Sequence, residues 1–282
     1  MQNNAIHALA KLVNRALSKV QTGSSSQDRA AHDSVERAPD GLPIPSEPLI
    51  KLVAGPRAGI SWFLEGGRRG AESIVEILER NGARFADLRA ILDFGCGCGR
   101  VIRHFSSAAG TKFYGADYNP EMVAWCERHL PFAKFTSNGL GPPLPFPSKK
   151  FDLVYALSVF THLSEELQFR WMEDLSRVLK PGGFLLLTTH GESYLGHFSD
   201  EEKQQFRSGK LITRGVANSG TNTCSAFHPP AYVRAELAKD FQVLDFIPEG
   251  AKGNPTQDAY LLRKPPLSTR LMTVGSNAYK SY

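Results

Sequence analysis

The chain has 282 residues, of which 41% are hydrophobic, 22% charged and 10% aromatic. This composition is typical of a globular protein with a sizeable core and excludes a wholly disordered chain. No apolar run approaches the roughly 18–20 residues that a membrane-spanning helix needs. The net charge of +5 is too small to predict nucleic-acid binding. Four cysteines without paired CxxC spacing indicate a reducing cytoplasm rather than a disulfide scaffold.

The first 48 residues divide into an amphipathic segment and a polar linker. Apolar side chains recur at helical spacing from Ile6 to Leu17, and no acidic residue precedes Asp28. Residues 1–20 therefore predict a peripheral membrane anchor, a partner-binding helix or a loosely docked appendage, and the basic, serine-containing segment also resembles a transit peptide. Residues 21–48 are polar and rich in proline, which predicts a linker. Residues 49–89 are expected to form a helical cap, with a helix over 71–81.

From residue 90 onward, short apolar runs alternate with helical stretches. The strand-length runs cover residues 91–94, 113–116, 151–156, 183–189, 241–247 and 258–263. The expected helices between them cover residues 101–108, 120–130 and 164–179. This alternation predicts an α/β fold with a mostly parallel sheet and helices on both faces. The expected core domain is 90–264, with a polar insertion at 191–230 that covers the substrate and a tail at 265–282.

The informative segment is Ile-Leu-Asp-Phe-Gly-Cys-Gly-Cys-Gly-Arg at residues 91–100. Three glycines alternate directly after an apolar strand, which permits a sharp turn and a close approach of the backbone to a ligand. Asp93 precedes this turn, and the next strand ends on Asp117. Both acids are expected at the carboxyl edge of the sheet, where ligands of open α/β proteins bind. A carboxylate at that edge can accept both hydroxyls of a ribose.

Two nucleotide ligands suit such a loop. A dinucleotide site prefers a small residue at the position that Arg100 occupies, so an NAD-dependent oxidoreductase is the weaker hypothesis. Asp93 would repel a pyrophosphate but suits S-adenosylmethionine, whose sulfonium and ammonium groups are positive. A non-catalytic binding module that keeps the loop is a further alternative.

The glycine segment and the strand that ends on Asp117 together resemble the cofactor signature of class I S-adenosylmethionine-dependent methyltransferases. The similarity continues through Phe-Asp-Leu-Val-Tyr-Ala at 151–156 and Leu-Lys-Pro-Gly-Gly-Phe at 179–184. Ser-Val-Phe-Thr-His-Leu at 158–163 resembles the UbiE-like, small-molecule branch of that family. The resemblance implies a Rossmann-like sheet of seven strands, the last antiparallel, with methyl transfer at its carboxyl edge.

The resemblance also implies roles for single residues. Asp93 would accept the ammonium of the cofactor, Asp117 would hold the ribose and Tyr118 would lie against the adenine. Asn138 stands where the family often has an acid that contacts adenine. The residues expected to bind S-adenosylmethionine are Asp93, Gly95, Gly97, Gly99, Asp117, Tyr118, Asn138, Leu157 and Ser158.

Three histidines are candidates for a direct role in catalysis. His162 and His190 follow strands that end at the expected site, and His228 precedes a pair of prolines. Neutral imidazole can take a proton from a hydroxyl near physiological pH, so His162 and His190 are the candidate general bases. No metal site is expected, because Cys96 and Cys98 lack the further ligands that zinc requires.

The residues after the fourth strand are Leu-Ser-Val at 157–159, and they narrow the range of possible methyl acceptors. They lack the motifs with which this superfamily methylates bases in nucleic acids or arginine side chains. We therefore expect methyl transfer to a small-molecule acceptor in the cytoplasm, with no nucleic-acid partner. The leading hypothesis is O-methylation of a hydroxyl or carboxyl on a sugar, a lipid or a secondary metabolite.

Overall fold

The computed structural model describes residues 36–56, 58–254 and 256–266. The chain divides into two compact units, Met1–Ile44 and Pro45–Tyr282. In the first unit, the described residues form one isolated bridge, between Arg37 and Pro43. The second unit holds every helix and strand discussed below. The amphipathic segment over residues 1–20 and most of the tail at 265–282 lie outside the described residues.

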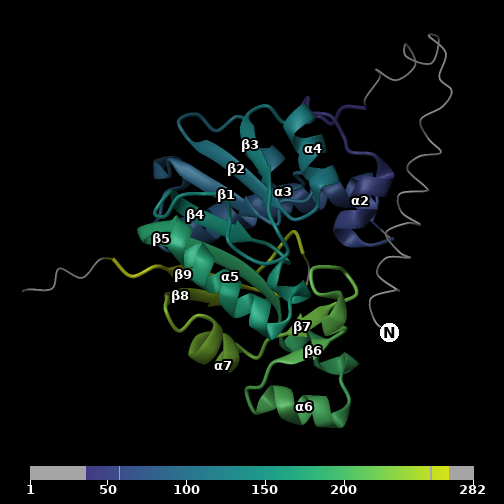
Figure 1. The fold of residues 1–282 in the computed structure, drawn as a ribbon, viewed down its shortest axis with the longest axis vertical. Coiled ribbons are helices and arrows are strands. Elements are labelled where there is room, and N and C mark those ends of the chain that lie inside the picture. The colour runs from purple at the N-terminus through teal and green to yellow at the C-terminus, as the bar shows by residue number, and fades with distance from the viewer. Residues whose placement is uncertain (1–35, 57, 255, 267–282) are drawn as a thin grey trace, which may run out of the picture. The chain divides into compact units, whose positions relative to one another are not determined.

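A nine-stranded sheet forms the centre of the second unit (Figure 1). Its strands are β1 (Ala90–Phe94), β2 (Lys112–Asp117), β3 (Ala133–Ser137), β4 (Phe151–Ala156), β5 (Leu179–His190), β6 (Ile212–Arg214), β7 (Ser225–Phe227), β8 (Gln242–Ile247) and β9 (Gln257–Arg263). Seven of them follow the order β3-β2-β1-β4-β5-β9-β8, in which β9 is antiparallel to both of its neighbours. The Rossmann-like fold predicted from the sequence is confirmed.

Helices cover both faces of this sheet. They are α2 (Glu47–Ala54), α3 (Ile60–Arg80), α4 (Pro120–His129), α5 (Glu165–Val178), α6 (Asp200–Arg207) and α7 (Pro230–Tyr232). Figure 1 shows α5 crossing the near face, with α3 behind the strands. The apolar side of α5 packs Trp171 and Leu175 into the cluster that contains Leu92 and Val154 of the central strands. Burial of side chains of this size contributes about 1.5–3 kcal/mol each.

Three helical segments differ from the sequence prediction, and β3 was not among the expected strands. α2 begins at Glu47, within the expected linker, because Pro48 falls in the first turn, where a helix needs no N–H donor, and Ile50 is fully buried. α3 begins at Ile60, well before residue 71, so that glycines at 66, 67 and 70 lie inside a helix. The helix expected over 101–108 is only a short 3-10 turn, Ile102–Phe105, and nothing in the local sequence explains its shortness.

The insertion at 191–230 has structure of its own. β7 continues the sheet beside the end of β5, where His190 pairs with Phe227, and β6 pairs antiparallel with β7. A small cluster of buried side chains, Phe198, Phe206, Ile212 and Phe227, supports this extension. The sheet therefore has two strands more than the seven of the predicted core.

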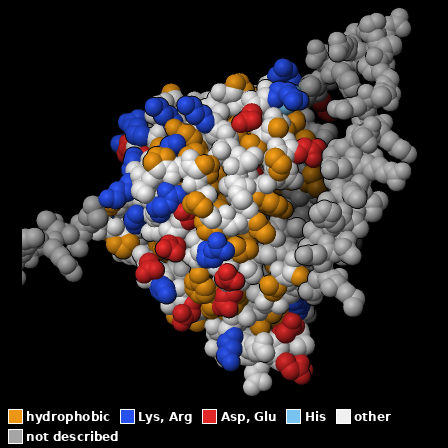
Figure 2. Space-filling view, viewed as in Figure 1, with side chains coloured by type: hydrophobic (Ala, Val, Ile, Leu, Met, Phe, Trp, Pro, Cys, Tyr) orange, Lys and Arg blue, Asp and Glu red, His pale blue; other side chains and the backbone are white. Residues whose placement is uncertain are grey.

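Charged and apolar side chains are interspersed on the face shown in Figure 2. Of the helices in the described part of the chain, none is long and apolar enough to cross a membrane.

Candidate active site

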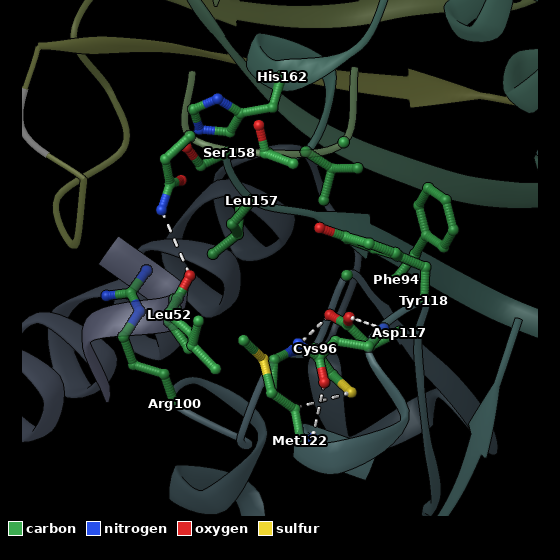
Figure 3. A pocket seen from close by; sticks show the side chains of 18 of the residues that line it. Leu52, Phe94, Cys96, Arg100, Asp117, Tyr118, Met122, Leu157, Ser158 and His162 are labelled. Atoms are coloured by element: carbon green, nitrogen blue, oxygen red, sulfur yellow. Dashed lines mark hydrogen bonds between the residues drawn. The ribbon is translucent and has the colours of Figure 1, made fainter. Parts of the chain in front are cut away.

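A pocket of about 790 Å³ lies at the carboxyl edge of β1, β2 and β4 (Figure 3). Its walls come from the end of α2, the glycine loop, the residues that follow β2, β3 and β4, and the insertion at residues 220–223. A volume of this size accommodates a drug-sized ligand. Most of the residues predicted from the sequence to bind a cofactor meet here.

The glycine loop forms the floor of the pocket. Gly95 and Gly97 line it with φ of +77° and +53°, a backbone region that favours glycine. A Cβ on Gly97 would lie 3.0 Å from Cγ2 of Val53. Gly99 does not line the pocket. A Cβ at this position would collide with Leu130, so the lack of a side chain on Gly99 lets α4 end close to the loop.

Asp117 lies at the end of β2 and is only 8% exposed. Its Oδ2 accepts a hydrogen bond from the amide of Gly97, and its Oδ1 accepts one from the amide of Asn119, both at 2.8 Å. Burial raises the pKa of Asp117, while these N–H donors oppose the shift. Each carboxylate oxygen keeps a second lone pair. Because Asp117 lines the pocket, its acceptor capacity fits the two hydroxyls of a ribose.

Tyr118 and Asn138 occupy the same side of the pocket as Asp117. Tyr118 is 42% exposed and presents its ring at the pocket wall. The Nδ2 of Asn138 donates to the carbonyl of Gly139, whereas its buried Oδ1 has no hydrogen-bond partner among the described residues. An acceptor left without a partner in a pocket wall is unusual. It fits an amino donor such as that of adenine, although the family often has an acid here.

Asp93 is one of the buried residues of β1, near its carboxyl end, and it lines the pocket. It is 4% exposed, and this burial raises its pKa to about 7. A carboxyl group in this state gains from a cationic ligand, because a positive charge beside it stabilises its ionised form. The position therefore fits the ammonium of S-adenosylmethionine.

His162 stands above Leu157 and Ser158 in the pocket (Figure 3). Its Nδ1 lies 2.8 Å from the carbonyl oxygen of Cys224. A carbonyl only accepts, so Nδ1 carries the proton and Nε2 keeps its lone pair. Burial lowers the pKa of His162, which favours the neutral ring. The geometry makes His162 a proton acceptor at the pocket wall.

His190 and His228 lie behind this wall and do not line the pocket. The ring of His190 packs 4.3 Å from that of Tyr194, and burial lowers the pKa of His190 to about 4. His228 is fully buried, with Nε2 3.0 Å from Oε1 of Gln168. The structure therefore does not bring His190 or His228 to the pocket beside His162.

A ring of hydrogen bonds fixes Ser158, whose φ of +60° is rare outside glycine. Its amide donates to Oγ1 of Thr188, which donates to Oε1 of Gln257. Nε2 of Gln257 then donates to Oγ of Ser158 across 2.9 Å. A strained residue held this firmly is typical of a functional site.

Several residues that line the pocket were not expected from the sequence. Gln257 begins β9, and because β9 is antiparallel its first residue meets the carboxyl end of β5. The antiparallel last strand was predictable, so this position could have been found. Lys51, Leu52 and Val53 come from α2, within the expected helical cap at 49–89, and no motif marks them.

Comparisons with known proteins identify a methyltransferase domain in this chain. A family profile described as "Methyltransferase domain" matches residues 91–183. The phosphoethanolamine N-methyltransferase of Plasmodium falciparum is 26% identical over 55% of this chain and 58% of its own length. A ubiquinone biosynthesis O-methyltransferase of Dictyostelium discoideum is 25% identical over 39% of this chain and 37% of its own length. The chain thus spans less than two thirds of these relatives.

A solved S-adenosylmethionine-dependent methyltransferase of Clostridium acetobutylicum shares the fold. It is 15% identical, with a TM-score of 0.52, and the match covers 70% of this chain and 91% of that one. This likeness shows the fold alone. Residues 91–183 therefore match a methyltransferase domain, and the pocket fits S-adenosylmethionine as its cofactor.

Proposed function

We propose that this protein transfers a methyl group to a hydroxyl of a small-molecule acceptor, with His162 as the general base. The observation that carries the proposal is the hydrogen bond between Nδ1 of His162 and the carbonyl of Cys224, because it leaves Nε2 as the proton acceptor. His162 shares the pocket with the residues suited to the cofactor.

S-adenosylmethionine supplies a methyl group on a sulfonium centre, which becomes a neutral thioether after transfer. The residues of the pocket hold the reactants and exclude water, since an in-line displacement depends on positioning. The acceptor hydroxyl loses its proton to Nε2 of His162 as the new O–C bond forms. Ser158, fixed by Gln257, stands beside this histidine and can hydrogen-bond a second oxygen of the acceptor.

The insertion at 191–230 is proposed to cover the acceptor. Asn222 donates to the carbonyl of Leu52 across 3.3 Å and so links the insertion to α2 at the pocket. The amide of Gly220 donates to the carbonyl of His162, and the amide of Ser164 donates to Oγ of Ser219. These contacts hold the loop against the catalytic histidine.

The proposed acceptor is a sugar, a lipid or a secondary metabolite. A small-molecule acceptor of this kind is consistent with the resemblance to the UbiE-like branch. One relative is named as an O-methyltransferase and another as an N-methyltransferase. A neutral imidazole with an open lone pair supports the oxygen acceptor, because a hydroxyl must lose a proton during transfer whereas a neutral amine attacks before it does.

A screen with methyl-labelled cofactor tests the proposal. Purified protein is incubated with hydroxylated sugars, phenols, hydroxy lipids and small carboxylic acids. On an acceptor that is methylated, His162→Gln should lower kcat by about 10²–10⁴-fold, the usual effect of losing a general base. Its affinity for S-adenosylhomocysteine should stay unchanged. His190→Gln, which alters a buried histidine outside the pocket, is the matched control and should retain most of its kcat.

Two outcomes would contradict the proposal. Near wild-type turnover by the His162→Gln variant would mean that catalysis proceeds by proximity alone. Binding of S-adenosylhomocysteine without methylation of any acceptor would favour the non-catalytic binding module.

A further inference from the structure

Lysine and arginine residues gather at the amino edge of the central sheet, where its parallel strands begin. Neighbouring parallel strands start at the same edge, so the first residues of β1, β2, β4 and β5 lie side by side. β9 is antiparallel to β5 and therefore ends at this edge. Figure 2 shows Lys and Arg side chains concentrated on the side of the molecule where Figure 1 labels β4 and β5. We call this surface the basic edge, and its members are Arg89, Lys112, Lys149, Lys180, Arg263 and Lys264.

Few acids balance the cations of the basic edge. Asp152 of β4 accepts from Nζ of Lys180 at 2.6 Å, and its other carboxylate oxygen accepts from the amides of Arg89 and Ala90. Among the residues that the structure describes, none forms an ion pair with the other five members. The net charge of the whole chain is only +5. Charges elsewhere in the chain therefore largely cancel, whereas those of the basic edge do not.

Two members of the basic edge lie close enough to repel each other. Nζ of Lys264 donates to the carbonyl oxygens of Ser176 at 2.6 Å and of Leu179 at 3.0 Å, so neutral groups fix its position. Burial and the charge of Lys149 both lower the pKa of Lys264. Like charges held together without a counter-ion are unfavourable. An anion in front of Lys149 and Lys264 would relieve this repulsion.

The loop before β4 adds apolar side chains to the same surface. Residues 142–147 read Pro-Pro-Leu-Pro-Phe-Pro, and the side chains of Pro143, Pro145 and Pro147 are exposed. This loop leads directly into Lys149. A surface that combines basic residues with exposed apolar side chains is typical of proteins that lie on a membrane.

A nucleic acid fits the basic edge less well. Single strands bind where aromatic rings stack on bases, and the grooves of a duplex take a helix or a ribbon. The aromatic rings beside the basic edge, those of Tyr114, Phe146 and Phe151, pack against one another. The ammonium of Lys150 lies 3.8 Å from the centre of the Tyr114 ring and 4.5 Å from that of Phe146. These rings are therefore occupied, and the basic edge presents strand ends rather than a helix.

We propose that the basic edge binds an anionic membrane surface, with the phosphate groups of acidic phospholipids as ligands of its lysines and arginines. Basic residues close to an anionic bilayer each strengthen binding, and their effect falls off within a Debye length. The pocket lies at the opposite, carboxyl edge of the sheet, so a protein attached in this way keeps its pocket open to water. The proposal holds whatever the acceptor of the methyl group is.

Sedimentation with vesicles tests the proposal. The full chain is mixed with vesicles of equal parts phosphatidylglycerol and phosphatidylcholine, and separately with vesicles of phosphatidylcholine alone. The wild-type protein should sediment with the anionic vesicles only, and about 0.5 M salt should release it. The triple variant Arg89→Gln/Lys112→Gln/Lys149→Gln should bind about 100-fold more weakly, because each basic residue near an anionic bilayer contributes a factor of about five.

A matched triple variant controls for the loss of net charge. Arg207, Lys210 and Lys239 are exposed and lie outside the basic edge. The variant Arg207→Gln/Lys210→Gln/Lys239→Gln removes as many positive charges and should bind the anionic vesicles as the wild-type protein does. Both triple variants should keep the wild-type Tm, which shows that they are folded without relying on cofactor binding or turnover.

Several results would overturn the proposal. Equal binding of anionic vesicles by the wild-type protein and the basic-edge variant would place membrane binding elsewhere, for example in residues 1–20. Equal losses in the two triple variants would show an effect of net charge alone. Failure of the wild-type protein to bind anionic vesicles would overturn the proposal as well. If a single-stranded oligonucleotide then bound the wild-type protein but not the basic-edge variant, the partner would be a nucleic acid.

Discussion

Oδ2 of Asp117 lies 2.8 Å from the amide nitrogen of Gly97, so the carboxylate suited to ribose also fixes the glycine turn. The acid at the end of one strand and the loop after its neighbour are thus one structural unit. A ligand that contacts both the Asp117 carboxylate and the glycine turn meets a site that is already arranged before it binds. Less conformational entropy is then lost on binding.

Asp117→Ala should weaken binding of S-adenosylhomocysteine by about 10-fold or more, because charge-assisted hydrogen bonds to the ribose are lost. The structure adds a second effect to this prediction. The amides of Gly97 and Asn119 also lose their acceptor, so the Tm should fall. Calorimetry and thermal denaturation measure the two effects. Unchanged affinity in a folded variant would show that Asp117 does not hold the ribose.

Gly97→Val should abolish cofactor binding more completely than Asp117→Ala. A β-branched side chain resists a φ of +53° and would crowd Val53 at the pocket floor. Gly82→Val is the matched control, since Gly82 has a φ of +76° but a Cβ there would meet no atom within 4 Å, and it lies outside the pocket. Normal binding by a folded Gly97→Val variant would refute the role of the loop.

The sequence predicted most strands of the central sheet and most of the expected residues that line the pocket, because both depend on local patterns. Apolar strands, alternating glycines and acids at strand ends each occupy a few consecutive residues. Gly99 has the same motif signal as Gly97, yet it serves the packing of Leu130. A motif fixes the conformation of a loop but does not show which of its residues face the ligand.

Contacts between distant segments were beyond sequence reasoning. In the sequence, the size of Arg100 argued against a dinucleotide ligand. Its hydrogen-bond partners, Gly253 and Asn254, come from the other end of the domain, so local patterns could not predict them. His162 and His190 follow neighbouring strands and their rings are 6.2 Å apart. Only the packing of the insertion places one at the pocket and the other behind it.

Asp93 predicts a pH dependence of stability. Its pKa of about 7 in the folded protein lies above the ordinary value of 3.8, so the folded state binds more protons between these two values. The unfolding free energy should therefore fall as pH rises through this window, relative to Asp93→Asn. Urea denaturation of both proteins at about pH 4.5 and pH 7.5 measures the difference. A difference that does not change with pH would contradict the assigned shift.

Binding of the cofactor should show the opposite trend, since an ammonium prefers the ionised carboxylate. Affinity for S-adenosylhomocysteine should rise as pH increases towards about 7 and then level off. Asp93→Asn should flatten this profile. A wild-type profile without this rise would mean that Asp93 does not contact the ammonium.

The pH profile of turnover tests His162. Burial lowers its pKa below the usual 6.5, and only the neutral ring accepts a proton. The value of kcat should therefore be constant near neutral pH and fall on the acidic side of 6.5. If the fall of kcat at acidic pH persisted in the His162→Gln variant, the titrating group would be another residue.

The central claim is that the pocket at the carboxyl edge of β1 and β2 binds S-adenosylmethionine. The most direct measurement is a calorimetric titration of the whole chain with S-adenosylhomocysteine, repeated with NAD under the same conditions. We predict saturable binding of one S-adenosylhomocysteine per chain, lost in Gly97→Val, and no binding of NAD. Binding of NAD in place of S-adenosylhomocysteine would contradict the account.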